Sequence, residues 1–283
     1  MKRAVIQGLL IVGMLSFALG AEALNSGQAA AQNPPAAGQA APAPQGKRPP
    51  QAKTDAELDA WKTAAALKTD AAEEKAADDF AAKFPDSELR VLLYKNAMRL
   101  YQNANNAEKT EAMGRKVLGL DGDDPEALVT VAEVIAERTH DTDIDKDQRY
   151  AEATAMAQKA TQTVDTDISV PTGTPQEKID SYKALLRSNA YSIMGTIEFK
   201  KENYVGAQEK LQKSIDAYPS DPDPVVILRL ALSLDKQQKY PEALKVANRA
   251  VEMTQDNTVV GTPARRERDR LQQLTGSAPA PPK

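Results

Sequence analysis

Three stretches of the sequence align with one another without gaps: QRYAEATAMAQKA from Gln148, ENYVGAQEKLQKS from Glu202 and QKYPEALKVANRA from Gln238. Each contains a Tyr, an Ala three residues later and a small residue ten after the Tyr, and the step from Tyr204 to Tyr240 is 36 residues. Self-similarity at a period between about 20 and 50 residues indicates a repeat architecture. We therefore expect a stack of similar helix pairs, which usually provides a surface for holding another protein.

The periodicity around these stretches is helical. From Ala56 onward, apolar and Ala residues recur at spacings of three and four, and the sequence contains no alternating β-branched run. Side-chain acceptors at Thr54, Asp70 and Thr174 predict helix starts. Helix pairs are expected near residues 56–84, 87–119, 125–163, 176–217 and 223–254, followed by a capping helix near 263–274.

The two ends of the chain differ in composition from its centre. Residues 1–23 predict a signal peptide, because Lys2 and Arg3 precede an apolar stretch that ends in small residues. An uncleaved membrane anchor is the alternative, although the apolar stretch is near the lower limit of about 17–25 residues. Ala, Pro and Gln dominate residues 24–53, which predict a disordered linker, and 276–283 predict a disordered tail. The helical repeat domain is assigned to 54–275.

Composition excludes several classes of function. The chain has no Cys, which excludes disulfides, thiolate metal sites and Cys nucleophiles. Its net charge of -4, from 36 basic and 40 acidic residues, gives no reason to expect a nucleic-acid partner. The run Arg265, Arg266, Arg268 and Arg270 is interpreted as a solvated face of the capping helix, with a phosphate or membrane contact as the alternative.

The repeated residues resemble the tetratricopeptide repeat family, as found in exported bacterial proteins. The best copy begins at Ser188, and the next begins at Pro224. Copies from Val91 and Pro125 match less closely, and the latter carries an insertion at residues 140–148. The residues that carry the resemblance in the two best copies are Tyr191, Met194, Gly195, Tyr204, Ala207, Leu211, Ser214, Pro219, Leu230, Ala231, Tyr240, Ala243, Ala247 and Ala250.

This resemblance implies an all-α fold, a right-handed α-solenoid of antiparallel helix pairs, with a protein or peptide partner and no cofactor. In the family, the first helix of each pair lines a concave groove. The residues that take outward positions on these helices are Lys95, Arg99, Glu133, Glu137, Asn189, Ser192, Thr196, Lys200 and Arg229. Only Lys95 fits the set with which some family members grip a terminal carboxylate, so we do not predict that clamp. These residues could equally serve only to solvate a curved surface.

The insertion contains the one metal-like pattern of the sequence. Asp141, Asp143, Asp145 and Glu152 resemble the spacing of a calcium-binding EF-hand loop. Lys146, however, occupies the position where that loop requires Gly, so a solvated acidic loop is the preferred interpretation. His140 is the only histidine of the chain, and no Ser or Thr motif accompanies it.

The sequence therefore predicts a non-enzymatic scaffold exported from a bacterial cytoplasm, most simply to the periplasm. It would bind a protein or peptide on its concave face. The alternative is an assembly or structural factor that is tethered to the inner membrane by an uncleaved N-terminus and acts through oligomerisation.

Overall fold

The computed structural model describes residues 47–171 and 173–276, and these residues form eleven helices. The predicted signal peptide, the linker up to residue 46 and the tail from residue 277 lie outside the described residues. The helices are α1 (Asp55–Ala65), α2 (Asp70–Lys83), α3 (Arg90–Asn103), α4 (Ala107–Leu120), α5 (Pro125–Arg138), α6 (Lys146–Thr163), α7 (Gln176–Lys200), α8 (Tyr204–Ala217), α9 (Pro224–Lys236), α10 (Tyr240–Glu252) and α11 (Gly261–Leu274).

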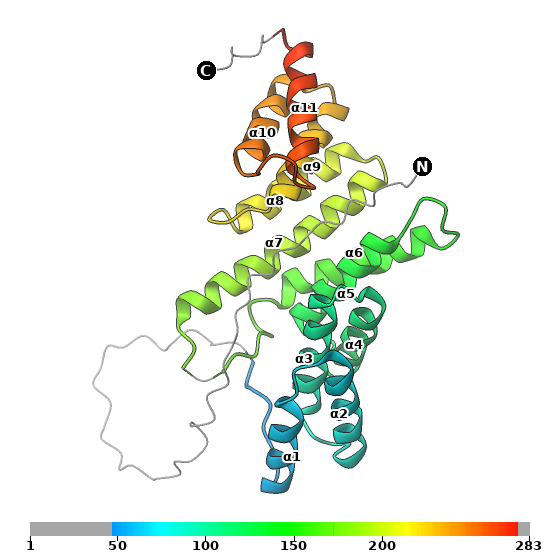
Figure 1. Cartoon of the computed structure of the whole chain (residues 1–283), viewed down its shortest axis with the longest axis vertical. Helices are drawn as coiled ribbons and strands as arrows, with labels where there is room; N and C mark the ends of the chain where they lie inside the picture. The colour runs from blue at the N-terminus through cyan, green and yellow to red at the C-terminus, as the bar shows by residue number, and fades with distance from the viewer. Residues whose placement is uncertain (1–46, 172, 277–283) are drawn as a thin grey trace, which may run out of the picture.

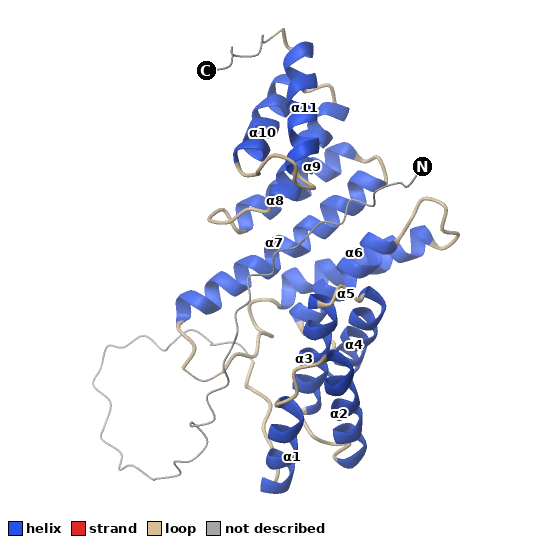
Figure 2. Cartoon of the chain, in the orientation of Figure 1, coloured by secondary structure: helices blue, strands red, loops and turns tan. Residues whose placement is uncertain are grey.

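Each helix packs against the next helix in sequence, and the stack runs from α1 at one end to α11 at the other (Figure 1). No strand occurs among the described residues (Figure 2). The predicted fold class, an all-α solenoid of antiparallel helix pairs, is confirmed. Among the helices of residues 47–171 and 173–276, none combines the length and the apolar character required to cross a membrane.

The helix starts agree only partly with prediction. Thr54 accepts a hydrogen bond from the Glu57 amide at 3.2 Å, as expected of an N-cap. The helix starts predicted at Asp70 and near Thr174 are confirmed, because α2 begins at Asp70 and α7 begins at Gln176, but neither Asp70 nor Thr174 is the N-cap. Asp70 lies inside the first turn of α2, and the Thr174 hydroxyl donates to the Pro171 carbonyl instead of accepting from α7. The unpredicted caps follow a shared pattern of Asn or Asp before the helix: Asn106, Asp124, Asn203 and Asp223.

A repeated turn joins the two helices of three pairs. Its central residue has a left-handed backbone, with φ of 55° at Asn105, 61° at Glu202 and 60° at Gln238. The amide after it donates to the carbonyl five residues earlier, a bond that satisfies an orphan carbonyl of the helix end. Asn203, for example, donates to Glu198 at 2.9 Å. Asn105 has the same place in its turn as Glu202 has in the turn before Tyr204. The residue of α4 that corresponds to Tyr204 is therefore Ala107, which is not a Tyr.

Small residues on the second helices allow the helix pairs to pack closely. The Ala of the Tyr-x-x-Ala pattern is completely buried in each of the three stretches, at Ala153, Ala207 and Ala243. At Gly195 of α7, an added Cβ would lie only 2.7 Å from Cγ of Leu211 on α8. The absence of a side chain at Gly195 therefore sets how closely α7 and α8 approach.

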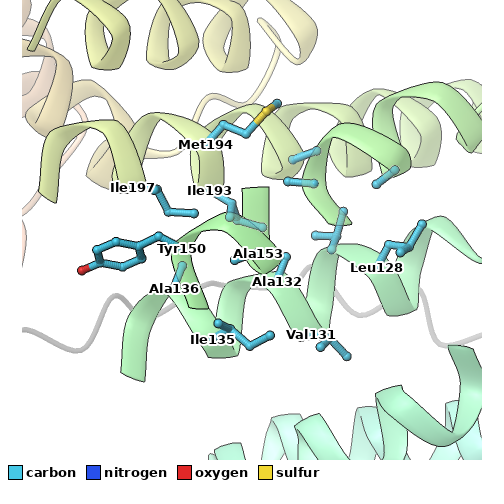
Figure 3. Packing of buried hydrophobic residues seen from close by; sticks show 14 residues of the cluster. Leu128, Val131, Ala132, Ile135, Ala136, Tyr150, Ala153, Ile193, Met194 and Ile197 are labelled. Atoms are coloured by element: carbon cyan, nitrogen blue, oxygen red, sulfur yellow. The ribbon is translucent and has the colours of Figure 1, made fainter. Parts of the chain in front are cut away.

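Apolar residues from neighbouring pairs fill the spaces between these small residues. In Figure 3, side chains from α5, α6 and α7 gather in one buried cluster, which includes Ile135, Tyr150, Ile193 and Ile197. A second cluster joins α8 to α11, and a third joins α1 to α5. The core is thus a series of interfaces along the stack, as expected of a solenoid.

The end of the predicted linker contacts the helical domain. The Lys47 ammonium pairs with Asp121 at 2.7 Å, and the Lys47 amide donates to the Ile168 carbonyl at 3.1 Å. Arg48 binds both carboxylate oxygens of Glu88, at 2.8 and 3.0 Å. Residues 47–53 therefore lie against the α4–α5 turn, the α6–α7 connection and the α2–α3 turn before α1 begins.

Candidate binding face on the odd-numbered helices

The residues predicted to line the groove lie on α3, α5, α7 and α9, the first helices of successive pairs. Among these helices, α5 contacts α7 and α7 contacts α9. We call the surface formed by their polar side chains the odd-helix face. It comprises Lys95, Arg99, Asp124, Glu126, Glu133, Glu137, Tyr182, Asn189, Ser192, Thr196, Lys200, Asp223 and Arg229.

The first part of this face is a cluster of ion pairs, which we call the saturated cluster. It comprises Lys95, Arg99, Asp124 and Glu126. The Lys95 ammonium lies 2.7 Å from Asp124 and 3.0 Å from Glu126, and all three side chains are at most 13% exposed. Arg99 makes a second ion pair with Glu126, with a distance of 2.6 Å from Nε to Oε1. Burial opposes ionisation of Glu126, but Arg99 and Lys95 outweigh it and hold the Glu126 pKa well below its usual value. Each charge here has an opposite partner.

Tyr182 extends this cluster onto α7. Burial, followed by the nearby Glu126 carboxylate, raises the Tyr182 pKa well above its usual value, so the phenol is neutral at physiological pH. Tyr182 also packs beside Leu186, Val164 and Ile168, which form a small apolar cluster at the α6–α7 connection. The longest helix, α7, thereby bridges the two halves of the odd-helix face.

The middle of the face carries carboxylates without a cation in contact. Glu133 is partly buried, and its carboxylate makes no hydrogen bond or ion pair with any described residue. Burial, with the carboxylates of Glu137 and Asp223, raises the Glu133 pKa to about 8. Glu137 is exposed, and burial raises the pKa of Asp223, although Arg229 opposes this. Asp223 caps α9 by accepting from the Val225 amide at 2.8 Å.

The middle of the odd-helix face also has two cations, Lys200 and Arg229, which hydrogen-bond to neutral groups. The Lys200 ammonium donates to the carbonyls of Ala136 at 2.6 Å and Thr139 at 3.1 Å, at the C-terminal end of α5. The Arg229 guanidinium donates to the Thr196 hydroxyl at 2.7 Å. Burial lowers the pKa values of both Lys200 and Arg229, and neither forms an ion pair within the described residues.

The two remaining predicted residues lie between these parts. Asn189 and Ser192 are partly buried on α7, in the stretch from Tyr182 to Thr196. The Ser192 carbonyl accepts a hydrogen bond from the Thr196 hydroxyl at 2.8 Å. Along α7, these uncharged side chains lie between Tyr182 and Thr196.

The acidic insertion is not arranged as a metal site in the part of the chain that the structure describes. No group of three or more His, Asp or Glu side chains there could hold a metal ion. Glu152 instead pairs with Arg115 of α4 at 2.8 Å, and Asp143 accepts from the His140 amide at 2.9 Å. The four candidate calcium ligands Asp141, Asp143, Asp145 and Glu152 are therefore not brought together.

The arginines of α11 are mostly paired with nearby acids. Arg265 pairs with Asp256, and Arg268 pairs with Asp269 at 2.6 Å. Arg270 pairs with Asp235 of α9 at 2.5 Å and with Glu267 at 2.9 Å. Three of the four arginines of the predicted run are thus paired with acids, and a solvated face of the capping helix stays the preferred interpretation.

Sequence reasoning missed four members of the odd-helix face: Asp124, Glu126, Tyr182 and Asp223. A signal for two of them was present, because Asp124-Pro125 and Asp223-Pro224 begin successive first helices in the same way. Asp before Pro at a helix start is a favoured combination. No comparable signal marked Glu126 or Tyr182, which join the face only through contacts between helices.

Comparison with known proteins gives matches of structure but not of sequence. No family model matches the chain, and no curated protein matches it. Among solved structures, it is similar to YrrB, described as a TPR protein with an unusual peptide-binding site, with a TM-score of 0.44 and 17% identity over 71% of this chain and 86% of that chain. It is also similar to the assembly chaperone of RpL4 (Acl4), with a TM-score of 0.39 and 14% identity over 78% of this chain and 98% of that chain.

The geometry of the chain itself carries the assignment of the fold. Helix pairs follow one another in sequence, small buried residues recur at the crossings, and the turn at Glu202 recurs at Gln238. The described chain is therefore an all-α solenoid of successive antiparallel helix pairs.

Proposed function

We propose that the chain is an exported scaffold that binds a protein or peptide segment along the odd-helix face and catalyses no reaction. The observation that supports this most is the region around Glu133. Polar groups that are partly removed from water are ordinarily hydrogen-bonded within the folded chain, because an unpartnered one destabilises the fold. The carboxyl group of Glu133 has no partner among the described residues, and a bound segment that supplied one would remove the penalty.

Export rests on the sequence of residues 1–23. A cleaved signal peptide would release the helical domain, whereas an uncleaved segment would tether it to a membrane, and assembly through oligomerisation is the second candidate function. Mass spectrometry of the N-terminus of the protein isolated from cells distinguishes these. A start near residue 21 or 24 supports release, and a start at residue 1 supports the tether.

Photo-crosslinking tests the binding face. A photoreactive amino acid replaces Asn189, which is partly buried on α7, or Lys245, which is exposed on α10. Peptides from a display selection on the purified chain should crosslink from position 189 and not from the control position 245. Crosslinks from position 245 alone, or equal crosslinks from both positions, would place binding elsewhere.

A further inference from the structure

We propose that residues 47–53, which we call the brace, fix the angles between successive helix pairs at three junctions of the stack and thereby set the curvature of the odd-helix face. The inference goes beyond the proposed function, because it concerns the shape of the helical domain and holds whether or not a peptide binds. In Figure 1 the brace is the blue segment that leads from the α6–α7 connection to α1.

The stack can change shape where one helix pair meets the next. In a solenoid each pair contacts mainly its neighbours, so small rotations at successive junctions add up to a large change in curvature. Three junctions concern the brace: the α2–α3 turn at 84–89, the α4–α5 turn at 121–124 and the α6–α7 connection that follows Thr163. Each of them precedes a helix of the odd-helix face. A tie between them therefore restrains how far α3, α5 and α7 can rotate apart.

Lys47 joins the second and third of these junctions. Its amide donates to the Ile168 carbonyl at 3.1 Å, in the α6–α7 connection, and its ammonium lies 2.7 Å from Asp121 in the α4–α5 turn. Asp167, beside Ile168, lies 3.8 Å from the same ammonium. A rotation that separates α5 from α7 at this edge of the stack would have to break at least one of these contacts.

The following residues extend the tie to the first junction. The Arg48 guanidinium donates to both carboxylate oxygens of Glu88, at 2.8 and 3.0 Å, and the Gln51 amide donates to the same carboxylate at 3.1 Å. The Lys53 ammonium donates to the Asp86 carbonyl at 2.7 Å. Because Asp86 and Glu88 both lie in the α2–α3 turn, the brace links this turn to the two junctions that Lys47 contacts.

The brace is stiff enough to transmit a restraint between its ends. Pro49 and Pro50 are partly buried, and their rings fix the backbone angle φ. Consecutive prolines favour an extended segment, whose length changes little. Ala52 packs against the cluster that joins α1 to α5, and the Lys53 amide donates to the Glu57 carboxylate at 2.7 Å in the first turn of α1. A flexible segment with the same charges would instead absorb a rotation by changing its own conformation.

The ion pairs of the brace are exposed, which makes its attachment sensitive to salt. The side chains of Lys47 and Arg48 are 39% and 59% exposed. An exposed ion pair contributes little on its own, and salt screens it, with a screening length of about 3 Å at 1 M ionic strength. The curvature of the stack should therefore become more variable as ionic strength rises, without loss of helix.

Spin labels can report the angles between pairs, because the chain has no Cys and introduced Cys residues are labelled specifically. Ala82→Cys on α2 with Val205→Cys on α8 places two labels across all three junctions. Val205→Cys with Lys245→Cys on α10 places two labels across the α8–α9 turn, which lies beyond the three junctions. All three positions are exposed. Pulsed electron–electron double resonance on the full chain gives the distance distribution of each label pair.

The first variant combines Lys47→Ala with Arg48→Ala and removes the ion pairs to Asp121 and Glu88. The ratio of detached to attached brace should rise about 2- to 30-fold, because two exposed ion pairs are lost. The distance distribution between positions 82 and 205 should broaden, while that between 205 and 245 should not. A second variant, in which a Gly-Ser segment of equal length replaces residues 47–52, also lacks the prolines and should broaden the first distribution further.

The matched control combines Lys75→Ala with Lys213→Ala. It removes the same charge, but the ion pairs of Lys75 with Asp79 and of Lys213 with Glu209 each lie within a single helix. Both distance distributions should therefore stay as in the parent. Raising the salt to about 1 M should broaden the 82–205 distribution of the parent and leave that of the Gly-Ser variant unchanged.

Two results would overturn the brace. One is an unchanged 82–205 distribution in the Gly-Ser variant, and the other is equal broadening of both distributions, which would indicate a general loosening of the stack. Broadening that occurs only where far-UV circular dichroism shows lost helix would also count against it. These distances do not depend on crosslinking from position 189, so the brace and the proposed function can fail separately.

Discussion

Adding one methyl group at Gly195 should destabilise the crossing of α7 and α8. The new Cβ would lie 2.7 Å from Leu211 Cγ, 2.8 Å from its Cδ2 and 3.1 Å from its backbone nitrogen. Carbon atoms in favourable contact lie about 3.5–4.0 Å apart, so the helices must separate. Overpacking costs about 1–3 kcal/mol, and removing a helical glycine returns about 1 kcal/mol. We expect Gly195→Ala to lower the free energy of unfolding by about 0–2 kcal/mol.

The completely buried Leu211 provides a second test of the same contact. Leu211→Ala alone should cost about 2–5 kcal/mol, because it leaves a cavity. In the double variant, the Cβ at position 195 enters space that the leucine has vacated. The double variant should therefore be more stable than the sum of the single effects predicts, by about 1–2 kcal/mol.

Gly119 of α4 is the matched control, because a Cβ there would meet nothing within 4 Å. Gly119→Ala should leave stability unchanged or increase it by up to about 1 kcal/mol. Urea unfolding followed by far-UV circular dichroism measures all four variants, and a shifted midpoint with an unchanged slope reports stability. Additive effects at Gly195 and Leu211, or stabilisation by Gly195→Ala equal to that by Gly119→Ala, would refute the assigned crossing.

Further variants test packing and charge. Ala243→Trp should lower the melting temperature, since overpacking at a fully buried site costs about 1–3 kcal/mol or more, and an unchanged temperature would contradict the alignment. Glu133→Gln should be more stable than the parent by about 1–3 kcal/mol at pH 8, and the two should be equally stable at pH 4. The reason is that the pKa of Glu133 is raised in the folded chain, so that ionisation of Glu133 destabilises the fold as pH rises from 4.5 to about 8. Equal urea midpoints at pH 8 would argue against this. Glu126→Gln should cost about 1–3 kcal/mol at pH 7, because it leaves Lys95 short of a partner. The lowered Glu126 pKa means that its contribution is present above pH 4.5 and is lost on acidification, so the variant and the parent should converge in acid titrations monitored by circular dichroism. Glu73→Met should raise stability by about 1–3 kcal/mol in urea titrations, because both oxygens of that buried carboxylate lack hydrogen bonds; a loss of stability would reveal a hidden partner.

Local spacing predicted the helices because helix formation depends on residues close in sequence. Pro125 and Pro224, as first helical residues, and the three-and-four spacing of Ala residues are visible without any tertiary contact. The left-handed turn at Glu202 and Gln238 was not predicted, because neither residue is the Gly or Asn that usually marks such a turn. There the packing of the two helices overrides the preference of the residue.

The sequence by itself determined the repeat register, and with it the helix pairs and the buried small residues at Ala207 and Ala243. Only the tertiary structure decided which charges of the odd-helix face are compensated. Lys95 and Asp124 form an ion pair across 29 positions of sequence, whereas Glu133 faces Asp223 of a distant helix. The physical reason is that electrostatic energy depends on distance in space and on access to water, and a repeat register specifies neither for side chains on different helices.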